Sequence, residues 1–113
     1  MMMIMGRLNV PEGIDARLNA VVDCEYARAL GIKVLSITSD EVRLEMDLRG
    51  KLNGYQVGHG GAVFALADQA FSIAANQGRY PQVATSARIR YVRPVQGILT
   101  AISRLISEDE KTT

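Results

Sequence analysis

The stretch that determines the architecture is HGGAVFALADQAFSIAAN, residues 59–76. It is rich in Ala and Leu and has few β-branched residues, so a helix is favoured over a strand. Apolar side chains lie on nearly every side of this helix, and such a helix is normally enclosed by the rest of the protein. We therefore expect a central buried helix over residues 62–76 that ends before Gly78.

The residues on the N-terminal side of this stretch predict another helix. Apolar residues recur at helical spacing through residues 12–30. Pro11 precedes the run and Gly31 follows it, at the positions that these residue types prefer at helix ends. We expect an amphipathic packing helix here, broken near Cys24.

Two strand-like runs follow that helix. Residues 32–38 have the composition of a strand, and residues 42–48 alternate apolar and polar side chains throughout. Strict alternation is typical of a half-buried antiparallel strand. Because Ser39 and Asp40 between the two runs favour a turn, we expect a β-hairpin.

Two more strands are predicted after the central helix. Residues 83–92 alternate until Pro94 stops them, and residues 98–106 form a second run. After a polar turn, residues 111–113 could begin a further strand. The order of helix, two strands, buried helix and two strands predicts an α+β fold with an antiparallel sheet.

Composition and charge limit the classes of function. A chain of 113 residues corresponds to one domain, which we expect to span residues 1–113 with a disordered start at 1–10. The net charge is +1, so no strong field attracts nucleic acid or a membrane surface. The longest apolar stretch, residues 62–75, is shorter than the ~20 residues that cross a bilayer. We expect neither nucleic acid nor a membrane as partner.

Cysteine and histidine each occur once, as Cys24 and His59. A single cysteine excludes an internal disulfide and is typical of a reducing cytoplasm, so we expect a cytoplasmic protein in which Cys24 is structural. One histidine with an aspartate supplies too few ligands for a metal ion. We therefore expect no metal site.

Asp68 is the strongest anomaly, because it places a carboxylate inside an otherwise apolar helix. A charged side chain without a partner is costly in a protein core. One interpretation is structural, with Asp68 capping a neighbour or pairing with an arginine. The other is functional, since a buried aspartate in a cleft is a candidate catalytic group.

The second anomaly is the start of the same helix, His59-Gly60-Gly61. The first N–H groups of a helix lack partners and carry partial positive charge. Glycine lets an acceptor approach closely, so such a site can hold an anion or a developing oxyanion. The alternative is a flexible helix entry with no chemical role.

Spacing connects the two anomalies. Gly60 and Asp68 are eight residues apart, which separates their backbones by ~12 Å along a helix. A reacting carbonyl must lie ~3 Å from its oxyanion donor and comparably close to its nucleophile or base. One helix cannot supply both groups to one substrate, whereas two copies related by a two-fold axis can. The chemistry therefore predicts an isologous homodimer with two sites at its interface.

At these residues the sequence resembles a known family. Asn53-Gly54 followed by HGGAVFALAD at residues 59–68 is similar to the pattern of the phenylacetate-degradation (PaaI-type) hotdog thioesterases. Residues 91–94, Tyr-Val-Arg-Pro, resemble the aromatic-x-Arg-Pro end of a family strand. The resemblance extends from about residue 30 to residue 106.

The resemblance implies a hotdog fold, a curved antiparallel sheet around a long central helix, and a homodimer or homotetramer. It implies hydrolysis of acyl-CoA thioesters with aryl-acetyl or short to medium acyl groups. Coenzyme A is then part of the substrate, and no other cofactor is expected. A non-catalytic acyl-CoA-binding hotdog module is the alternative, and Asp68 distinguishes the two because a pure binder does not need that carboxylate.

Transferred onto this chain, the family pattern assigns the reaction to four residues. Gly60 would donate its N–H to the oxyanion, and Asp68 of the partner copy would attack the carbonyl or activate a water. Asn53 would position the water or the substrate, and His59 would orient the helix start. A purely structural role for His59, holding the loop over the helix, stays open.

Further residues would contact the substrate. Gly61 lies beside the oxyanion site, and either Thr85 or Ser86 would supply an assisting hydroxyl. Arg93, like Arg88 and Arg90, could bind the phosphates of coenzyme A. For any single arginine, a solvated strand face is the simpler interpretation.

The C-terminal part departs from the family pattern, which continues with two more strands. Those strands lie between the ones predicted here at residues 98–106 and 83–92. We therefore expect a hotdog sheet that lacks its last two strands and has a gap at that place. Three explanations stay open, namely that the sequence is a fragment truncated at its C-terminus, that another chain fills the space, or that the fold is altered.

Overall fold

The computed structural model of the chain describes residues 10–104 and 106. The expected disordered start lies outside the described residues except for Val10, and so does the strand that could begin at residues 111–113. Within the described part, the helices and strands are α1 (Ile14–Val22), α2 (Glu25–Leu30), β1 (Lys33–Ile37), β2 (Val42–Asp47), α3 (Gly60–Ala75) and β3 (Ile98–Ser103).

The predicted N-terminal helix is present in two pieces, α1 and α2, separated at Asp23 and Cys24. The expected break near Cys24 is thus confirmed. Gly31 ends α2 in the left-handed conformation, with φ of 69°, and its N–H donates to the carbonyls of Ala27 and Arg28. A residue without Cβ adopts this conformation at little cost, which is why the helix ends here.

The predicted hairpin is also present. β1 and β2 pair antiparallel, with an irregularity in the register between Val34 and Ser36. The Thr38 hydroxyl accepts hydrogen bonds from the N–H groups of Asp40 and Glu41, and this closes the turn. β3 pairs antiparallel with the other edge of β2, so the sheet order is β1-β2-β3.

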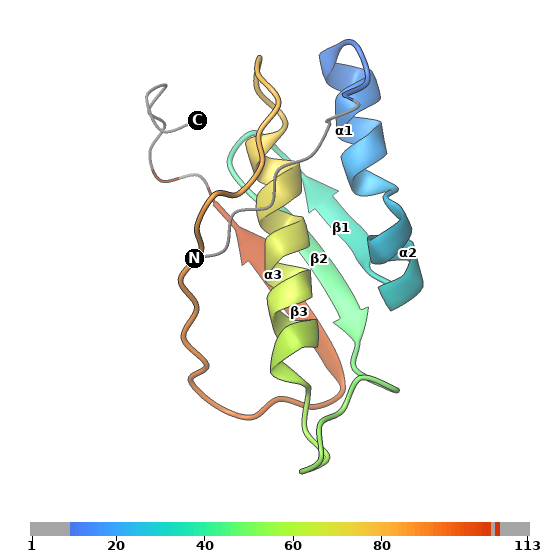
Figure 1. Cartoon of the computed structure of the whole chain (residues 1–113), viewed down its shortest axis with the longest axis vertical. Helices are drawn as coiled ribbons and strands as arrows, with labels where there is room; N and C mark the ends of the chain where they lie inside the picture. Colours follow the sequence, from blue (N-terminus) through green and yellow to red (C-terminus); the bar gives the residue numbers. More distant parts are fainter. Residues whose placement is uncertain (1–9, 105, 107–113) are drawn as a thin grey trace.

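The core lies between this sheet and α3, which runs across one face of the sheet (Figure 1). The alternation of β2 points its apolar side chains toward the helix, and residues 42, 44, 46 and 48 are fully buried. From α3, Leu66, Ala70 and Ile73 pack against them. This arrangement of a helix on an antiparallel sheet confirms the α+β class.

The central helix is less enclosed than its composition predicts. Only one of its faces is fully buried, and Phe71 on another face is 42% exposed. Asp68 is half-buried. The described part of the chain therefore covers the sheet side of α3 and leaves much of the opposite side accessible.

The prediction of a strand over residues 83–92 is wrong. This segment is irregular and exposed, and it runs along α3 from the C-terminal end of the helix back toward its start (Figure 1). Strand hydrogen bonds require a neighbouring strand, and β3 forms the edge of the three-stranded sheet described here. The segment alternates like a strand but has no partner among the described residues.

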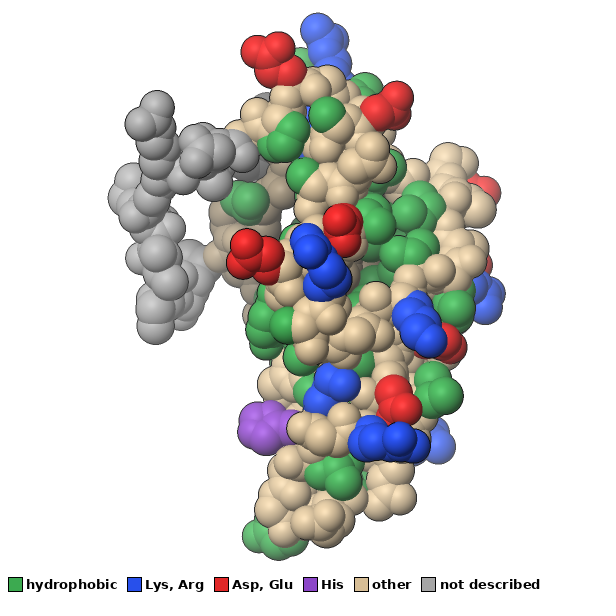
Figure 2. Space-filling model, turned by 90° about the vertical axis from the view of Figure 1, so that its right-hand side faces the viewer, with side chains coloured by type: hydrophobic (Ala, Val, Ile, Leu, Met, Phe, Trp, Pro, Cys, Tyr) green, Lys and Arg blue, Asp and Glu red, His purple; other side chains and the backbone are tan. Residues whose placement is uncertain are grey.

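The surface carries mixed charges. Figure 2 shows acidic and basic side chains interspersed over the face that carries α1 and α2. On the sheet, hydrogen bonds from Arg43 and Arg104 lower the pKa of Glu41 below its ordinary value. Among the residues described, no helix has the length and apolarity needed to cross a membrane.

Candidate active site

The start of α3 leaves one backbone N–H free. His59 is the N-cap, and its Nδ1 accepts a hydrogen bond of 2.9 Å from the N–H of Gly61. The carbonyl of His59 accepts from the N–H groups of Ala62 and Val63. Of the first four helix amides, only that of Gly60 donates to no residue in the described part of the chain. The helix therefore presents a single available donor at its positive end.

The imidazole of His59 is held in one tautomer by this contact. A ring nitrogen that accepts a hydrogen bond carries no proton, so the neutral ring has its proton on Nε2. The side chain itself is exposed. A Cβ on Gly61 would lie 3.1 Å from Nδ1, tighter than most such contacts, so glycine at this position lets the cap form.

Tyr91 lies against the same helix start. Its hydroxyl donates a 3.0 Å hydrogen bond to the carbonyl of Gly60, across 31 residues of sequence. A Cβ on Gly60 would meet the tyrosine ring at 3.4 Å, which is an ordinary van der Waals distance. Tyr91 therefore fixes the irregular segment to the helix start without covering the free N–H with a hydrogen bond.

Asn53 organises the loop before the helix. Its Oδ1 accepts hydrogen bonds from the N–H groups of Tyr55 and Val57, and its own N–H donates to the carbonyl of Val57. Gln56 occupies the tip with a positive φ of 63°. The side-chain oxygen of Asn53 is thus used within the loop, and only its NH2 group is left to contact a water or a substrate.

The side chain of Asp68 has no hydrogen bond and no ion pair with any residue that the structure describes. The structural interpretation, a cap or an arginine partner, therefore finds no support in the described part of the chain. The half-buried carboxyl group lines two cavities, one of about 530 Å³ and one of about 270 Å³. Ala84 is the other residue that the two cavities share.

The smaller cavity lies between α3 and the irregular segment. Ser86 lines it together with Asp68, whereas Thr85 lines neither cavity. Of the two hydroxyls considered from sequence, Ser86 is the one that shares a cavity with the carboxylate. All three arginines are exposed, and of them only Arg88 lines this cavity, while Arg90 and Arg93 line neither.

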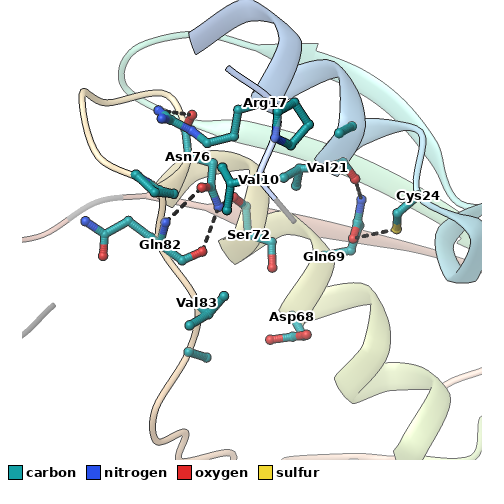
Figure 3. A pocket seen from close by; sticks show the side chains of 14 residues that line it. Val10, Arg17, Val21, Cys24, Asp68, Gln69, Ser72, Asn76, Gln82 and Val83 are labelled. Carbon is teal, nitrogen blue, oxygen red and sulfur yellow. Dashed lines mark hydrogen bonds between the residues drawn. The ribbon is translucent and has the colours of Figure 1, made fainter. Parts of the chain in front are cut away.

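The larger cavity lies between α1, α3 and the start of the irregular segment (Figure 3). Nothing in the sequence predicted that residues of α1 and α3 would form the wall of a cavity here. Gln69 connects its two helices, because its Nε2 donates to the carbonyl of Val21 over 2.8 Å and its Oε1 accepts from the thiol of Cys24 over 3.7 Å. Cys24 is half-buried and belongs to the wall.

A buried arginine closes the far end of α3. Arg17 is only 6% exposed, and its guanidinium donates to the carbonyls of Asn76, Gly78 and Arg79. Asn76 is the C-cap of α3, where a cation is favoured, and Gly78 and Arg79 belong to the loop that follows. The signal in the sequence was the position of Arg17 on the apolar face of α1, one turn before Val21.

Asn76, the C-cap of α3, forms further hydrogen bonds at the C-terminal end of the helix. It is 3% exposed, its Nδ2 donates to the carbonyls of Ser72 and Gln82, and its Oδ1 accepts from the N–H of Gln82. Arg17 and Asn76 together fix the loop that carries the chain into the irregular segment (Figure 3).

The arrangement as a whole places the candidate groups on one helix but not at one point. Gly60 and Asp68 lie at positions 1 and 9 of α3, so a rise of ~1.5 Å per residue separates their backbones by ~12 Å. Near Asp68 and in the rest of the described chain, no three His, Cys, Asp or Glu side chains come together as metal ligands.

The family model of the thioesterase superfamily matches residues 55–107. The acyl-coenzyme A thioesterase PaaI of Escherichia coli (strain K12) is 35% identical over 89 residues, which are 76% of this chain and 64% of that protein. The chain thus spans less than two thirds of the length of this relative.

Solved structures agree with the sequence match. The structure of the E. coli PaaI protein from the phenylacetic acid degradation operon superposes with a TM-score of 0.71 at 34% identity, over 78% of this chain and 66% of that one. A mutant of the phenylacetic acid degradation protein PaaI from Thermus thermophilus superposes with a TM-score of 0.70 at 33% identity, over 75% of this chain and 76% of that one. The helix on an antiparallel sheet and these matches together establish that the chain belongs to the PaaI-type, hotdog-fold thioesterase family.

Proposed function

We propose that this protein hydrolyses acyl-CoA thioesters. The observation that carries the proposal is the combination of a free Gly60 N–H at the start of α3 with an unpaired, half-buried Asp68 on the same helix. An oriented backbone donor stabilises the oxyanion of acyl transfer, and a carboxylate supplies the nucleophile or base. The similar PaaI of E. coli is named as an acyl-coenzyme A thioesterase, which supports the same reaction here.

The reaction begins with attack on the thioester carbonyl. The Asp68 carboxylate either adds directly, so that departure of the coenzyme A thiolate leaves an anhydride that water then cleaves, or removes a proton from an attacking water. The carbonyl oxygen becomes an oxyanion, which the Gly60 N–H stabilises. The C–S bond breaks, and the coenzyme A thiolate takes up a proton. The products are a carboxylic acid and free coenzyme A.

The other candidate residues support this step. His59 orders the helix start by accepting from Gly61, so that only the Gly60 N–H is left for the oxyanion. Ser86 shares the smaller cavity with Asp68 and can orient the water, a role for which Thr85 is less well placed. The NH2 group of Asn53 is the part of that side chain that can contact water or substrate.

The ~12 Å between Gly60 and Asp68 leads us to propose a homodimer, in which Gly60 of one copy and Asp68 of the other serve one substrate. A homotetramer would contain two such pairs. The accessible side of α3 and the irregular segment, with exposed Phe71, Ile89 and Tyr91, offer an apolar surface for this contact. Arg88 and Arg93 are the arginines we propose to meet the phosphates of coenzyme A.

The test is Asp68→Asn, assayed on a panel of acyl-CoA esters by detection of the released thiol. We expect the rate to fall by about 10²-fold or more, because a catalytic group is lost while the shape of the side chain is kept. Sedimentation of both proteins reports assembly. An unchanged rate in Asp68→Asn would remove the carboxylate from the mechanism, and a strictly monomeric active enzyme would remove the shared site.

A further inference from the structure

We infer that the larger cavity holds the acyl group of the substrate, and that α1, through Ala20, limits how large an acyl group is accepted. This inference rests on the proposed function and names the part of the chain that selects the substrate. It concerns the wall between α1 and α3 (Figure 3).

The position of Asp68 is the first argument. A thioester extends in two directions from its carbonyl, with the acyl group on one side and coenzyme A on the other. Asp68 lines both cavities, so a carbonyl next to it has one cavity available for each side.

Charge assigns the two sides. The larger cavity, about 530 Å³, falls within the ~300–1,000 Å³ typical of small-molecule pockets, so it has room for an acyl group. Arg88 lines the smaller cavity, which places a cation on the side suited to an anionic cofactor. The acyl group therefore belongs in the larger cavity.

The wall of the larger cavity suits an apolar group. Val21, Cys24 and Val83 contribute apolar surface. Gln69 and Asn76 also line it, but their polar atoms already bond to Val21, Cys24, Ser72 and Gln82.

Arg17 lines this wall as well and, like Asp68, is a charged group. Its terminal nitrogens are engaged with main-chain carbonyls. Its Nε has no hydrogen-bond partner in the described part of the chain, but it is buried, so a ligand in the cavity cannot reach it. The cavity thus offers a ligand little polar interaction away from Asp68 and the Ser72 hydroxyl, and it favours alkyl or aryl acyl groups over acyl groups that end in a charge.

Ala20 is the residue through which α1 limits the space. Ala20 is exposed and lines the larger cavity, so a leucine there would occupy volume that an acyl group needs. Leucine has nearly the helix propensity of alanine, so α1 should form normally. Ala16 gives a matched control, because it lies one turn earlier on α1 and is exposed like Ala20 but lines neither cavity.

The first experiment compares kcat/KM for acetyl-, hexanoyl- and phenylacetyl-CoA in the wild type, Ala20→Leu and Ala16→Leu. We expect Ala20→Leu to lose about tenfold or more on the two larger esters relative to acetyl-CoA, since one methylene in an apolar pocket changes specificity about 10–200-fold. Ala16→Leu should keep the wild-type profile. Identical profiles for all three proteins would overturn the inference.

The second experiment does not depend on turnover. Cys24 is the only cysteine of the chain and lines the larger cavity, so its alkylation by iodoacetamide reports occupancy. We expect S-hexyl-CoA, a thioether that cannot be hydrolysed, to slow alkylation about tenfold at ten times its Kd, since protection scales with 1 + [L]/Kd. Desulfo-CoA, which has no acyl group, should leave the rate unchanged.

The two outcomes separate this inference from the proposed function. Protection of Cys24 without hydrolysis of any ester would support the acyl cavity and refute the thioesterase. Hydrolysis with no protection by the thioether would refute the acyl cavity and leave the thioesterase in place.

Discussion

The two ends of α3 differ in how they satisfy their free backbone groups. At the start, the cap formed by His59 accounts for three of the first four N–H groups and leaves that of Gly60 without a partner in the described chain. At the end, Arg17 and Asn76 engage the last carbonyls with buried side chains. Every helix has such groups at both ends, so the difference lies in what surrounds them.

This difference separates function from stability along one helix. A free donor at an accessible helix start costs little, because water or a ligand can bind it, and it is available to an oxyanion. Carbonyls at a buried helix end have no water, so they require a donor from the protein. Substitutions at the start should therefore affect turnover, and substitutions at the end should affect folding.

The largest expected effect comes from Gly60→Pro. Proline is favoured at the first position of a helix and has no N–H, and His59 before it has the extended backbone that a following proline requires. We expect the variant to fold but to lose about 10²–10³-fold in kcat, the effect of deleting one oxyanion donor.

Gly60→Ala is the control for this prediction. It keeps the N–H and adds a Cβ at an ordinary 3.4 Å from Tyr91, so kcat should stay near the wild-type value. Steady-state kinetics and circular dichroism decide the result. Equal rates for the proline and alanine variants would show that this N–H takes no part in hydrolysis.

Arg17→Met should give the largest loss of stability. It retains the aliphatic packing but leaves the carbonyls of Asn76, Gly78 and Arg79 without their charged donor. We expect the free energy of unfolding to fall by about 2–3 kcal/mol, because hydrogen bonds from a charged group contribute about 1.5–3 kcal/mol and the bond to Asn76 is buried.

Thermal unfolding measures this effect, which corresponds to a decrease in Tm on the order of 10 °C. Arg17→Lys should give a smaller decrease, because an ammonium group can reach some of the carbonyls but lacks the planar fork of arginine. A wild-type Tm in Arg17→Met would mean that the end of α3 is not stabilised by this side chain.

His59→Ala should have a smaller effect on stability. It removes the acceptor for the Gly61 N–H, and loss of an N-cap costs about 1 kcal/mol. His59→Asn should restore most of this, because asparagine is a preferred N-cap. Denaturant titration gives the stability, and the thioester assay run beside it identifies the role of the imidazole. Full recovery of rate in His59→Asn would make the role of His59 structural, whereas recovery of stability alone would place the imidazole in contact with the substrate.

Tyr91→Phe should have the smallest effect. It deletes the exposed 3.0 Å hydrogen bond to the Gly60 carbonyl and keeps the ring in place. A loss of about 0.5–1 kcal/mol in unfolding free energy is expected from one such bond. The same titration measures this loss. A loss above that range would show that the position of the irregular segment depends on the Tyr91 hydrogen bond more strongly than expected for an exposed bond.

Much of the candidate site was predictable because it is local. The alternation in residues 42–48 and the composition of residues 59–76 identified the strand and the helix that form the core. Glycine at position 31 predicted the end of α2. Residue type and spacing also singled out the helix start and Asp68 as candidates, and their roles stay predictions.

The remaining features depend on distant residues. Whether Thr85 or Ser86 faces Asp68 follows from the path of an irregular segment, and local alternation does not determine that path. The capping of α3 by Arg17 joins residues 59 to 62 positions apart, so no sequence window contains it. The hydrogen bond from Gln69 on α3 to Val21 on α1, which lies in the wall of the larger cavity, also joins residues that are far apart in the sequence.

The sequence by itself determined the helices and the hairpin, because a helix makes its hydrogen bonds within its own segment and a hairpin makes them with the next one. Only the tertiary structure decided the conformation of residues 83–92, which alternate like a strand and yet are irregular. A strand forms only where another strand accepts its hydrogen bonds, and that neighbour is a property of the whole fold.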